Sequence, residues 1–215
     1  SDGNWPNPYD RNILPLPPEN IVGINVFPMS RPQYEYRNYS GIGGAAPGVP
    51  NMPFEMAFDK ISFRQNLDPA GQYFLLDGYA RGVHMHFDAN SILKLTYKKE
   101  DWLIDADYLK SNSTEHNMIS VLRDGRAEKP MPECAGVAHV ADLPTVAMTE
   151  TVMNDYNGID WRRGIIWKKG GYIAIFDRCR ADQPGKYTLD CVFKTLDMGS
   201  EKLVTPNCFC ISRSV

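Results

Sequence analysis

The sequence predicts an all-β fold, specifically an antiparallel two-sheet β-sandwich. Short runs of alternating apolar and polar residues follow one another along most of the chain, and charged or Gly/Pro-rich segments of turn length separate them. This arrangement is typical of antiparallel strands. No segment shows the sustained 3.6-residue apolar period of an amphipathic helix. Two stacked sheets give such strands a common core, so a sandwich is favoured.

The chain begins with segments that have no apolar core of their own. Residues 1–20 are rich in Pro and Asn and are expected to form an extended arm, and IVGINVF, starting at Ile21, is expected to form a first strand. A Gly/Pro-rich loop at 41–53 either covers a binding surface or is an ordinary mobile loop. We therefore assign 1–58 to the arm, first strand and loop, and 59–215 to the sandwich domain. The final NCFCISRSV keeps a strand pattern to its end, so we expect a C-terminally truncated domain.

Within the sandwich domain, alternation predicts successive strands at 59–66, 72–80, 91–97, 102–108 and 117–125. Beyond Gly125 we expect a Pro-containing linker that leads to VAHVADLPTVAMTETV, to which no strand is assigned. From Arg163 we expect a hairpin that turns at KKGG, and then a strand in GKYTLDCVFKTL. The inner face of this ladder is expected to carry Trp167, Tyr172, Ile175 and Phe193.

Composition and charge exclude some classes of partner. Hydrophobic residues make up 43% of the chain and charged residues 23%, as in ordinary globular proteins. The net charge of -3 argues against non-specific nucleic-acid binding, which needs clustered Lys and Arg. No apolar run reaches the roughly 18 residues that a membrane-spanning helix requires. We expect neither a nucleic-acid partner nor a membrane partner.

The five cysteines show no metal-binding CxxC pair. Cys179, Cys191, Cys208 and Cys210 fall in strand-like runs, where a free thiol usually behaves as a small buried hydrophobe. We expect buried thiols, and a bridge between Cys179 and Cys191 on adjacent strands is left open.

The candidate chemistry lies in the stretch 73–121, which contains three of the four histidines. His84 and His86 are separated by one residue, so on an extended segment both side chains leave the same face. Asp105 ends the apolar run WLI, and His116 opens the next strand. If adjacent strands bring His86, Asp105 and His116 together, two imidazoles and a carboxylate suit Zn²⁺, with a water or fourth ligand. The alternative is that these histidines are hydrogen-bonded core or surface residues.

Neighbouring polar residues have simpler interpretations. Asp88 and Asn90 favour local backbone bonding and are first interpreted as turn and strand-cap residues, with a substrate contact as the alternative for Asn90. Arg81 could bind a carboxylate bidentately or remain solvated. His139 is expected at the surface.

The run DGYARGVHMHFDANSILKLTYKKEDWLIDADY followed by EHN resembles the C-terminal β-sandwich of heparinase II/III family polysaccharide lyases. The later WRRGIIWKKGGYIAIFDRCRADQPGKYTLDCVFKTL resembles the strand ladder of that family, so the likeness spans 59–196. The resemblance implies β-elimination on an acidic, uronate-containing polysaccharide such as a glycosaminoglycan, in the periplasm or outside the cell. The family's N-terminal α/α toroid, which supplies a catalytic Tyr, is missing here, so the fragment alone is expected to be inactive.

By motif position, the resemblance makes His84 the catalytic residue of the sandwich. It also implies a structural zinc held by His86, Asp105 and His116. The segment between Asp105 and His116 is shorter than is usual in the family, and this departure weakens the assignment of the third zinc ligand. Substrate binding is assigned, on the least evidence, to Arg81, Asn90 and Tyr108.

Two other functions fit the same residues. A non-catalytic carbohydrate-binding or structural sandwich would keep the metal, because the metal supports folding, and would have lost the reaction. A cupin-like metalloenzyme also starts from an HxH pair, but it needs a Glu a few residues on, where this chain has Asp88. Self-association of the fragment through the face that a toroid would cover is a further expectation.

Overall fold

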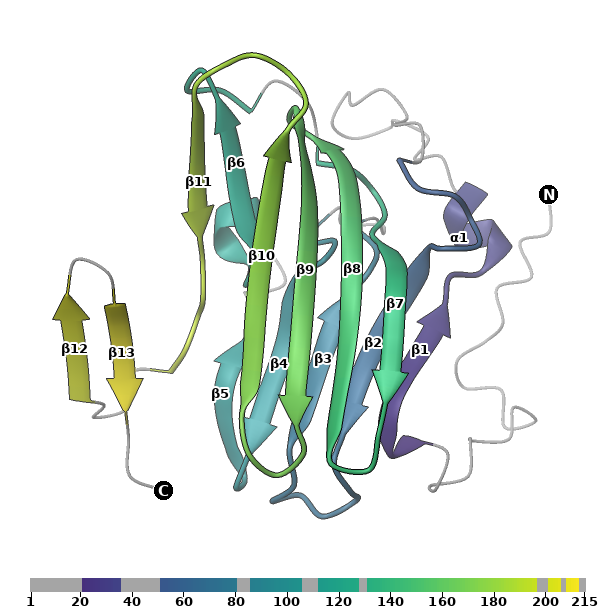
Figure 1. Cartoon of the computed structure of the whole chain (residues 1–215), viewed down its shortest axis with the longest axis vertical. Helices are drawn as coiled ribbons and strands as arrows, with labels where there is room; N and C mark the ends of the chain where they lie inside the picture. The colour runs from purple at the N-terminus through teal and green to yellow at the C-terminus, as the bar shows by residue number, and fades with distance from the viewer. Residues whose placement is uncertain are drawn as a thin grey trace.

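The computed structural model describes residues 21–35, 51–80, 86–105, 112–127, 131–196, 201–205 and 208–212. Nearly all of the secondary structure in these ranges is antiparallel strand, so the predicted all-β class is confirmed. A four-stranded sheet lies in front of a five-stranded sheet in Figure 1, which gives the predicted two-sheet sandwich.

The five-stranded sheet has the order β1-β2-β3-β4-β5. Its strands are β1 (Gly23–Pro28), β2 (Phe58–Arg64), β3 (Tyr73–Asp77), β4 (Ile92–Tyr97) and β5 (Glu100–Ile104). β1 pairs along β2 and forms one edge of the sheet, so the strand assigned above to the 1–58 segment is part of the sandwich. The predicted turn at 98–101 is confined to Lys98 and Lys99, which both have positive φ, and β5 begins directly after them.

The four-stranded sheet has the order β10-β9-β8-β7. Its strands are β7 (Gly136–Asp142), β8 (Val146–Tyr156), β9 (Ile159–Lys168) and β10 (Ile173–Ala181). The linker predicted after Gly125 is therefore wrong over 136–156, where β7 and β8 form a hairpin. Two of the buried positions of β8 are Thr149 and Thr151, and these threonines weaken the apolar alternation that marks a strand.

The core lies between the two sheets. Buried residues alternate strictly along β9 (Ile159, Trp161, Arg163, Ile165 and Trp167) because side chains of period two share one face. Trp167 meets Phe63 of β2 with ring centroids 6.0 Å apart. Burial of each such aromatic contributes about 1.5–3 kcal/mol.

The predicted burial is wrong for two residues of the expected core. Tyr172 is 64% exposed, because it lies in the turn before β10. Phe193 is 44% exposed, because it lies beyond the end of β11 (Tyr187–Cys191), outside the stacked sheets.

The remaining elements flank the sandwich. β11 pairs with β6 (Ile119–Arg123), and β12 (Glu201–Thr205) pairs with β13 (Cys208–Ser212) in a hairpin that Figure 1 shows beside the sandwich. A short helix α1 (Arg31–Glu35) and a 3-10 turn η2 (Ser113–Glu115) complete the list. Among the residues that the structure describes, no helix has the length and apolarity of a membrane span.

All five cysteines are free thiols. The predicted burial is wrong for Cys191, Cys208 and Cys210, which are exposed, whereas Cys134 is buried. Cys179 and Cys191 lie on β10 and β11, which belong to different sheets, so the adjacent-strand pairing needed for the bridge is absent.

Candidate metal centre

The residues of the candidate site come from three chain segments. His86 and Asp88 precede the turn at 89–90 that leads into β4, and His116 follows η2. One ligand atom from each of His86, Asp88 and His116 lies within 4.8 Å of the others. Asp105, which directly follows β5, lies next to this group. The fold thus brings together the two histidines singled out from the sequence, and it adds Asp88.

Asn117 explains why His116 and Asp105 meet. Its side-chain amide nitrogen donates to the backbone oxygens of Ile92 and Ile104, both at 2.8 Å. Its side-chain oxygen accepts from the backbone nitrogen of Lys194. This fully buried amide therefore ties the start of β4 to the end of β5, directly beside the cluster.

The two ring nitrogens of His116 have different environments. Nδ1 is 2.9 Å from a carboxylate oxygen of Asp105. Nε2 is buried and has no hydrogen-bond partner. The imidazole faces that of His86, with ring centroids 5.7 Å apart. A neutral imidazole that donates from Nδ1 to Asp105 has its lone pair on Nε2, which is the arrangement of a metal-bound histidine oriented by a carboxylate.

Asp88 is both a turn residue and a member of the cluster. Its backbone oxygen accepts from Ser91, as the turn interpretation predicts. Its carboxylate is buried, and Oδ1 has no hydrogen-bond partner. Burial, together with the negative charges of Asp77 and Asp105, raises the pKa of Asp88 to about 7. A buried carboxylate in this state would gain from a nearby cation.

The protonation of His116 follows from the same charges. Burial lowers its pKa, but the hydrogen bond to Asp105 and the charges of Asp105 and Asp88 outweigh burial, so its pKa lies above the usual value. The carboxylates of Asp105 and Asp88 therefore favour a positive charge at the position of the His116 ring.

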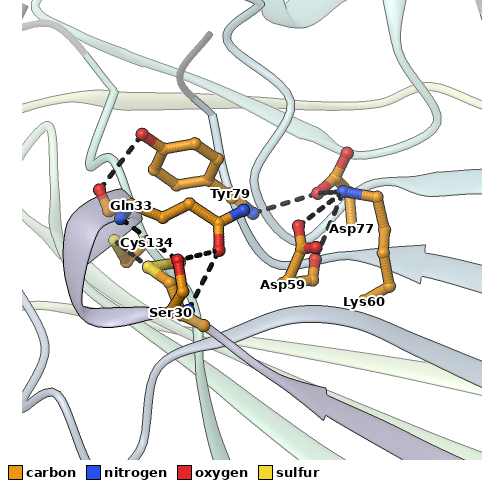
Figure 2. Close-up of polar contacts among 8 residues, drawn as sticks. Ser30, Gln33, Asp59, Lys60, Asp77, Tyr79 and Cys134 are labelled. Atoms are coloured by element: carbon orange, nitrogen blue, oxygen red, sulfur yellow. Dashed lines mark hydrogen bonds and ion pairs between the residues drawn. The ribbon is translucent and has the colours of Figure 1, made fainter. Parts of the chain in front are cut away.

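The third nearby carboxylate, Asp77, already has a cationic partner. Figure 2 shows Lys60 between Asp59 and Asp77, with its Nζ 3.0 and 2.8 Å from their carboxylate oxygens. The backbone nitrogen of Tyr79 also donates to Asp77. Burial lowers the pKa of Lys60, but the charges of the two aspartates outweigh it and raise that pKa. Asp77 is therefore satisfied within the fold, whereas Asp88 is not.

Asn90, a candidate substrate contact in the sequence analysis, is fully buried. Its side-chain oxygen accepts from the Thr151 hydroxyl at 2.6 Å, and its backbone oxygen accepts from Arg163 at 2.8 Å. It has a φ of 67°, which Asn tolerates better than most residues. Through these two bonds, Asn90 anchors the turn that follows Asp88 to strands β8 and β9 of the four-stranded sheet.

The donor set fits a zinc ion. Two imidazoles and a carboxylate are preferred zinc ligands, and the unpartnered Nε2 and Oδ1 atoms are the free donors that such an ion would use. Asp105 then orients His116 through Nδ1, although the sequence analysis assigned it as a ligand. The sequence held a sign of this exchange, because His86 and Asp88 are separated by one residue and therefore leave the same face of an extended segment.

The other predicted site residues cannot be placed. His84 and Arg81 belong to 81–85, and Tyr108 belongs to 106–111, both outside the described residues. His139 is exposed on β7, as expected, and its Nε2 lies 3.7 Å from Glu150.

Comparison with solved structures identifies the fold. Neither the protein-family models nor the curated proteins give a match. A crystal structure of heparinase III matches with a TM-score of 0.54 and 14% identity over 75% of this chain and 27% of the other. A heparinase III gene product matches with the same score and identity over 77% and 27%. A mutant of the heparan sulfate lyase HepC from Pedobacter heparinus matches with a TM-score of 0.50 and 16% identity over 68% and 24%.

These structures are the ones that the sequence resemblance points to. The chain spans about a quarter of the length of each, so it corresponds to one part of a longer molecule. At this level of identity the likeness concerns the fold. The chain thus shares its β-sandwich fold with part of the heparinase III structures.

Proposed function

We propose that this chain is the β-sandwich part of a polysaccharide lyase that cleaves a uronate-containing acidic polysaccharide by β-elimination. The observation that carries the proposal is the His86/Asp88/His116 cluster, which lies two residues beyond His84 on a sandwich of the heparinase III fold. The cluster has unpartnered donors in its interior, and its neighbour in sequence is the histidine that the family resemblance makes catalytic.

In this reaction a base removes the proton from C5 of the uronate, the C4–O bond breaks, and a C4=C5 double bond forms while the leaving oxygen is protonated. His84 would contact the uronate unit as a neutral imidazole, able to accept a proton or to donate a hydrogen bond near pH 7. A zinc ion held by His86, Asp88 and His116 would supply structural support. Asp105 would orient His116, and Asn117 would keep both β-strand ends in place.

The proposal includes a larger protein. Because the chain spans about a quarter of the similar structures, the remaining catalytic groups, including the proton-shuttling Tyr, would come from an α/α toroid elsewhere in the parent protein. An acidic polysaccharide of this kind is an extracellular polymer, so a periplasmic or extracellular location belongs to the same proposal.

The test uses the full-length protein that contains this chain. We expect incubation with glycosaminoglycans and other uronate polymers to produce the ultraviolet absorbance of an unsaturated uronate. His84→Ala should lower the rate by about 10²–10⁴-fold, as expected for loss of a general acid–base group. His139→Ala is the matched control, because His139 is exposed on β7, and it should retain full activity.

Two results would contradict the proposal. If no uronate polymer yields an unsaturated product, the protein is not a lyase of this kind. A wild-type rate in His84→Ala would instead leave a sandwich that binds carbohydrate or supports the fold without taking part in the reaction.

A further inference from the structure

A pocket of about 400 Å³ lies beside the candidate metal centre and is lined in part by Phe87. Phe87 lies between His86 and Asp88 in sequence and lines the pocket with the η2 turn, strand β6 and the turn between β8 and β9. The volume is in the range of small-molecule sites. None of the residues discussed above as metal ligands lines it, so it is a separate feature of the fold.

Hydroxyl groups form one wall of the pocket. The Ser113 and Ser120 hydroxyls are 3.0 Å apart. The Tyr156 hydroxyl lies near both serines, and burial raises its pKa, so it stays a neutral donor and acceptor. Thr114 adds a further hydroxyl at the exposed side. A hydroxyl both donates and accepts, so this wall matches a ligand that itself carries several hydroxyls.

Asn157 adds an acceptor of fixed orientation. Its side-chain nitrogen donates to the backbone oxygens of Val121 and Arg126, at 3.2 and 2.9 Å. These two bonds assign the amide, so Oδ1 is the remaining atom, and it is buried without a partner. A type I′-like turn at Asn157–Gly158, with φ values of 51° and 89°, holds this side chain in the pocket wall.

Among the residues that the structure describes, the pocket lining carries no charge. Every described residue that lines the pocket is apolar, a hydroxyl residue or an amide. An ionised ligand would lose hydration there without gaining an opposite charge, which is costly. The apolar part of the lining includes the aromatic side chains of Phe87 and Tyr156, which can pack against the C–H face of a ring.

We propose that this pocket binds an uncharged sugar ring. Hydroxyls and an amide acceptor meet the ring hydroxyls, aromatic side chains meet its apolar face, and the neutral lining disfavours a uronate. The inference stands apart from the elimination reaction, because it uses none of the residues assigned to that chemistry. A protein without lyase activity would still bind such a sugar.

The test is an NMR titration of the isotope-labelled 215-residue chain with methyl glycosides of glucose, galactose and N-acetylglucosamine. At least one should shift the amide signals of Ser113, Ser120, Val121 and the Asn157 side chain in a saturable manner, with a dissociation constant of about 1–10 mM. Methyl glucuronide differs from methyl glucoside only by a carboxylate at C6, and it should bind at least about tenfold more weakly than the best neutral sugar.

Two substitutions of alanine by phenylalanine test where the sugar binds. Ala127 is exposed and lines the pocket, so Ala127→Phe should fill its mouth and abolish the shifts. Ala141 is exposed on β7 away from the pocket lining, and Ala141→Phe should bind like the wild type. The inference is overturned if no neutral sugar gives saturable shifts, if the glucuronide binds equally well, or if Ala127→Phe leaves binding unchanged.

Discussion

Two buried charged clusters of this sandwich differ in how far the fold satisfies them. Arg163, fully buried on β9, donates from Nε and Nη2 to the two carboxylate oxygens of Asp177 on β10, at 2.8 and 3.1 Å. Its Nη1 donates to the backbone oxygens of Asn90 and Asn117. In the His86/Asp88/His116 cluster, by contrast, a ring nitrogen and a carboxylate oxygen are buried without partners.

The difference separates a self-contained structural cluster from a candidate binding site. The Arg163 cluster is complete within the chain: Trp161 donates to the same carboxylate, and the guanidinium lies 4.7 Å from the Trp161 ring. It needs no ligand. The His86/Asp88/His116 cluster instead holds a buried ring nitrogen and a buried carboxylate oxygen without partners, which are the atoms that a bound cation would use. The two are linked, because Arg163 binds the backbone next to both Asp88 and His116.

Breaking the complete cluster should have the largest effect. Arg163→Met leaves the largely buried Asp177 carboxylate, 12% exposed, without its cation. It also removes the donor to the backbone oxygens of Asn90 and Asn117. Removing one partner of a buried ion pair costs about 3–5 kcal/mol. We expect the free energy of unfolding, measured by urea titration, to fall by that amount.

Arg162→Met is the matched control for this loss. Arg162 is the preceding residue on β9, its side chain is 43% exposed, and its guanidinium lies 3.3 Å from Glu150. An exposed pair contributes about 0–1 kcal/mol, so this variant should remain close to the wild type. Equal losses in the two variants would show that the buried cluster is not a special source of stability.

The β9–β10 hairpin shows what the sequence can reveal. Its alternation predicts both strands and the turn at KKGG, and Trp167 is buried as expected. The same alternation places Arg163 in phase with the buried Trp161 and Ile165, so the sequence pattern already indicates a buried cation on β9. The β7–β8 hairpin carried a weaker signal, because Thr149 and Thr151 occupy buried positions of β8 where the strand pattern leads one to expect apolar residues.

The candidate site was predictable in part for a related reason. The order of the expected strands suggested that His86, Asp105 and His116 could meet, because adjacent antiparallel strands lie side by side. Asp88 was assigned to the turn, although the alternation that relates His84 to His86 also places Asp88 on the face of His86. Asp105 was found in the right place, but only the geometry shows that it meets Nδ1 of His116.

Removing single carboxylates should separate ligand from orienting residue at the metal centre. After purification with zinc and dialysis, we expect the wild-type chain to retain about one zinc ion by elemental analysis. Asp88→Asn should lose it, because the amide replaces an anionic ligand. Asp105→Asn should keep a bound ion with about 10–100-fold lower affinity, the usual cost of losing an orienting carboxylate.

Asp101→Asn provides the control, since Asp101 is a β5 carboxylate that pairs with Lys94 at 3.1 Å and lies outside the metal cluster. It should bind zinc like the wild type. Retention in Asp88→Asn with complete loss in Asp105→Asn would return Asp105 to the ligand set that the sequence suggested. A wild-type chain that takes up no zinc would leave the cluster as a metal-free feature.

The smallest effect should come from a thiol at the edge of the complete cluster. Cys179 pairs with Trp161 across β9 and β10. Burial, with the charge of Asp177, raises its pKa from 9.0 to about 11, and Arg163 offsets part of this. A thiol with a raised folded pKa stabilises the protein below its unfolded pKa, and that stability is lost as pH rises from about 9 to 11.

The full shift would correspond to about 2.7 kcal/mol, and solvent screening of this half-buried thiol reduces the expected loss to about 1 kcal/mol. Urea unfolding under reducing conditions, at about pH 8.5 and about pH 10.5, measures it. The wild type and the exposed-thiol control Cys210→Ala should lose about 1 kcal/mol more than Cys179→Ala over this interval. An equal loss in Cys179→Ala would mean that the thiol ionises as freely in the folded chain as in the unfolded one, and that the low-dielectric environment of the Arg163 cluster does not extend to Cys179.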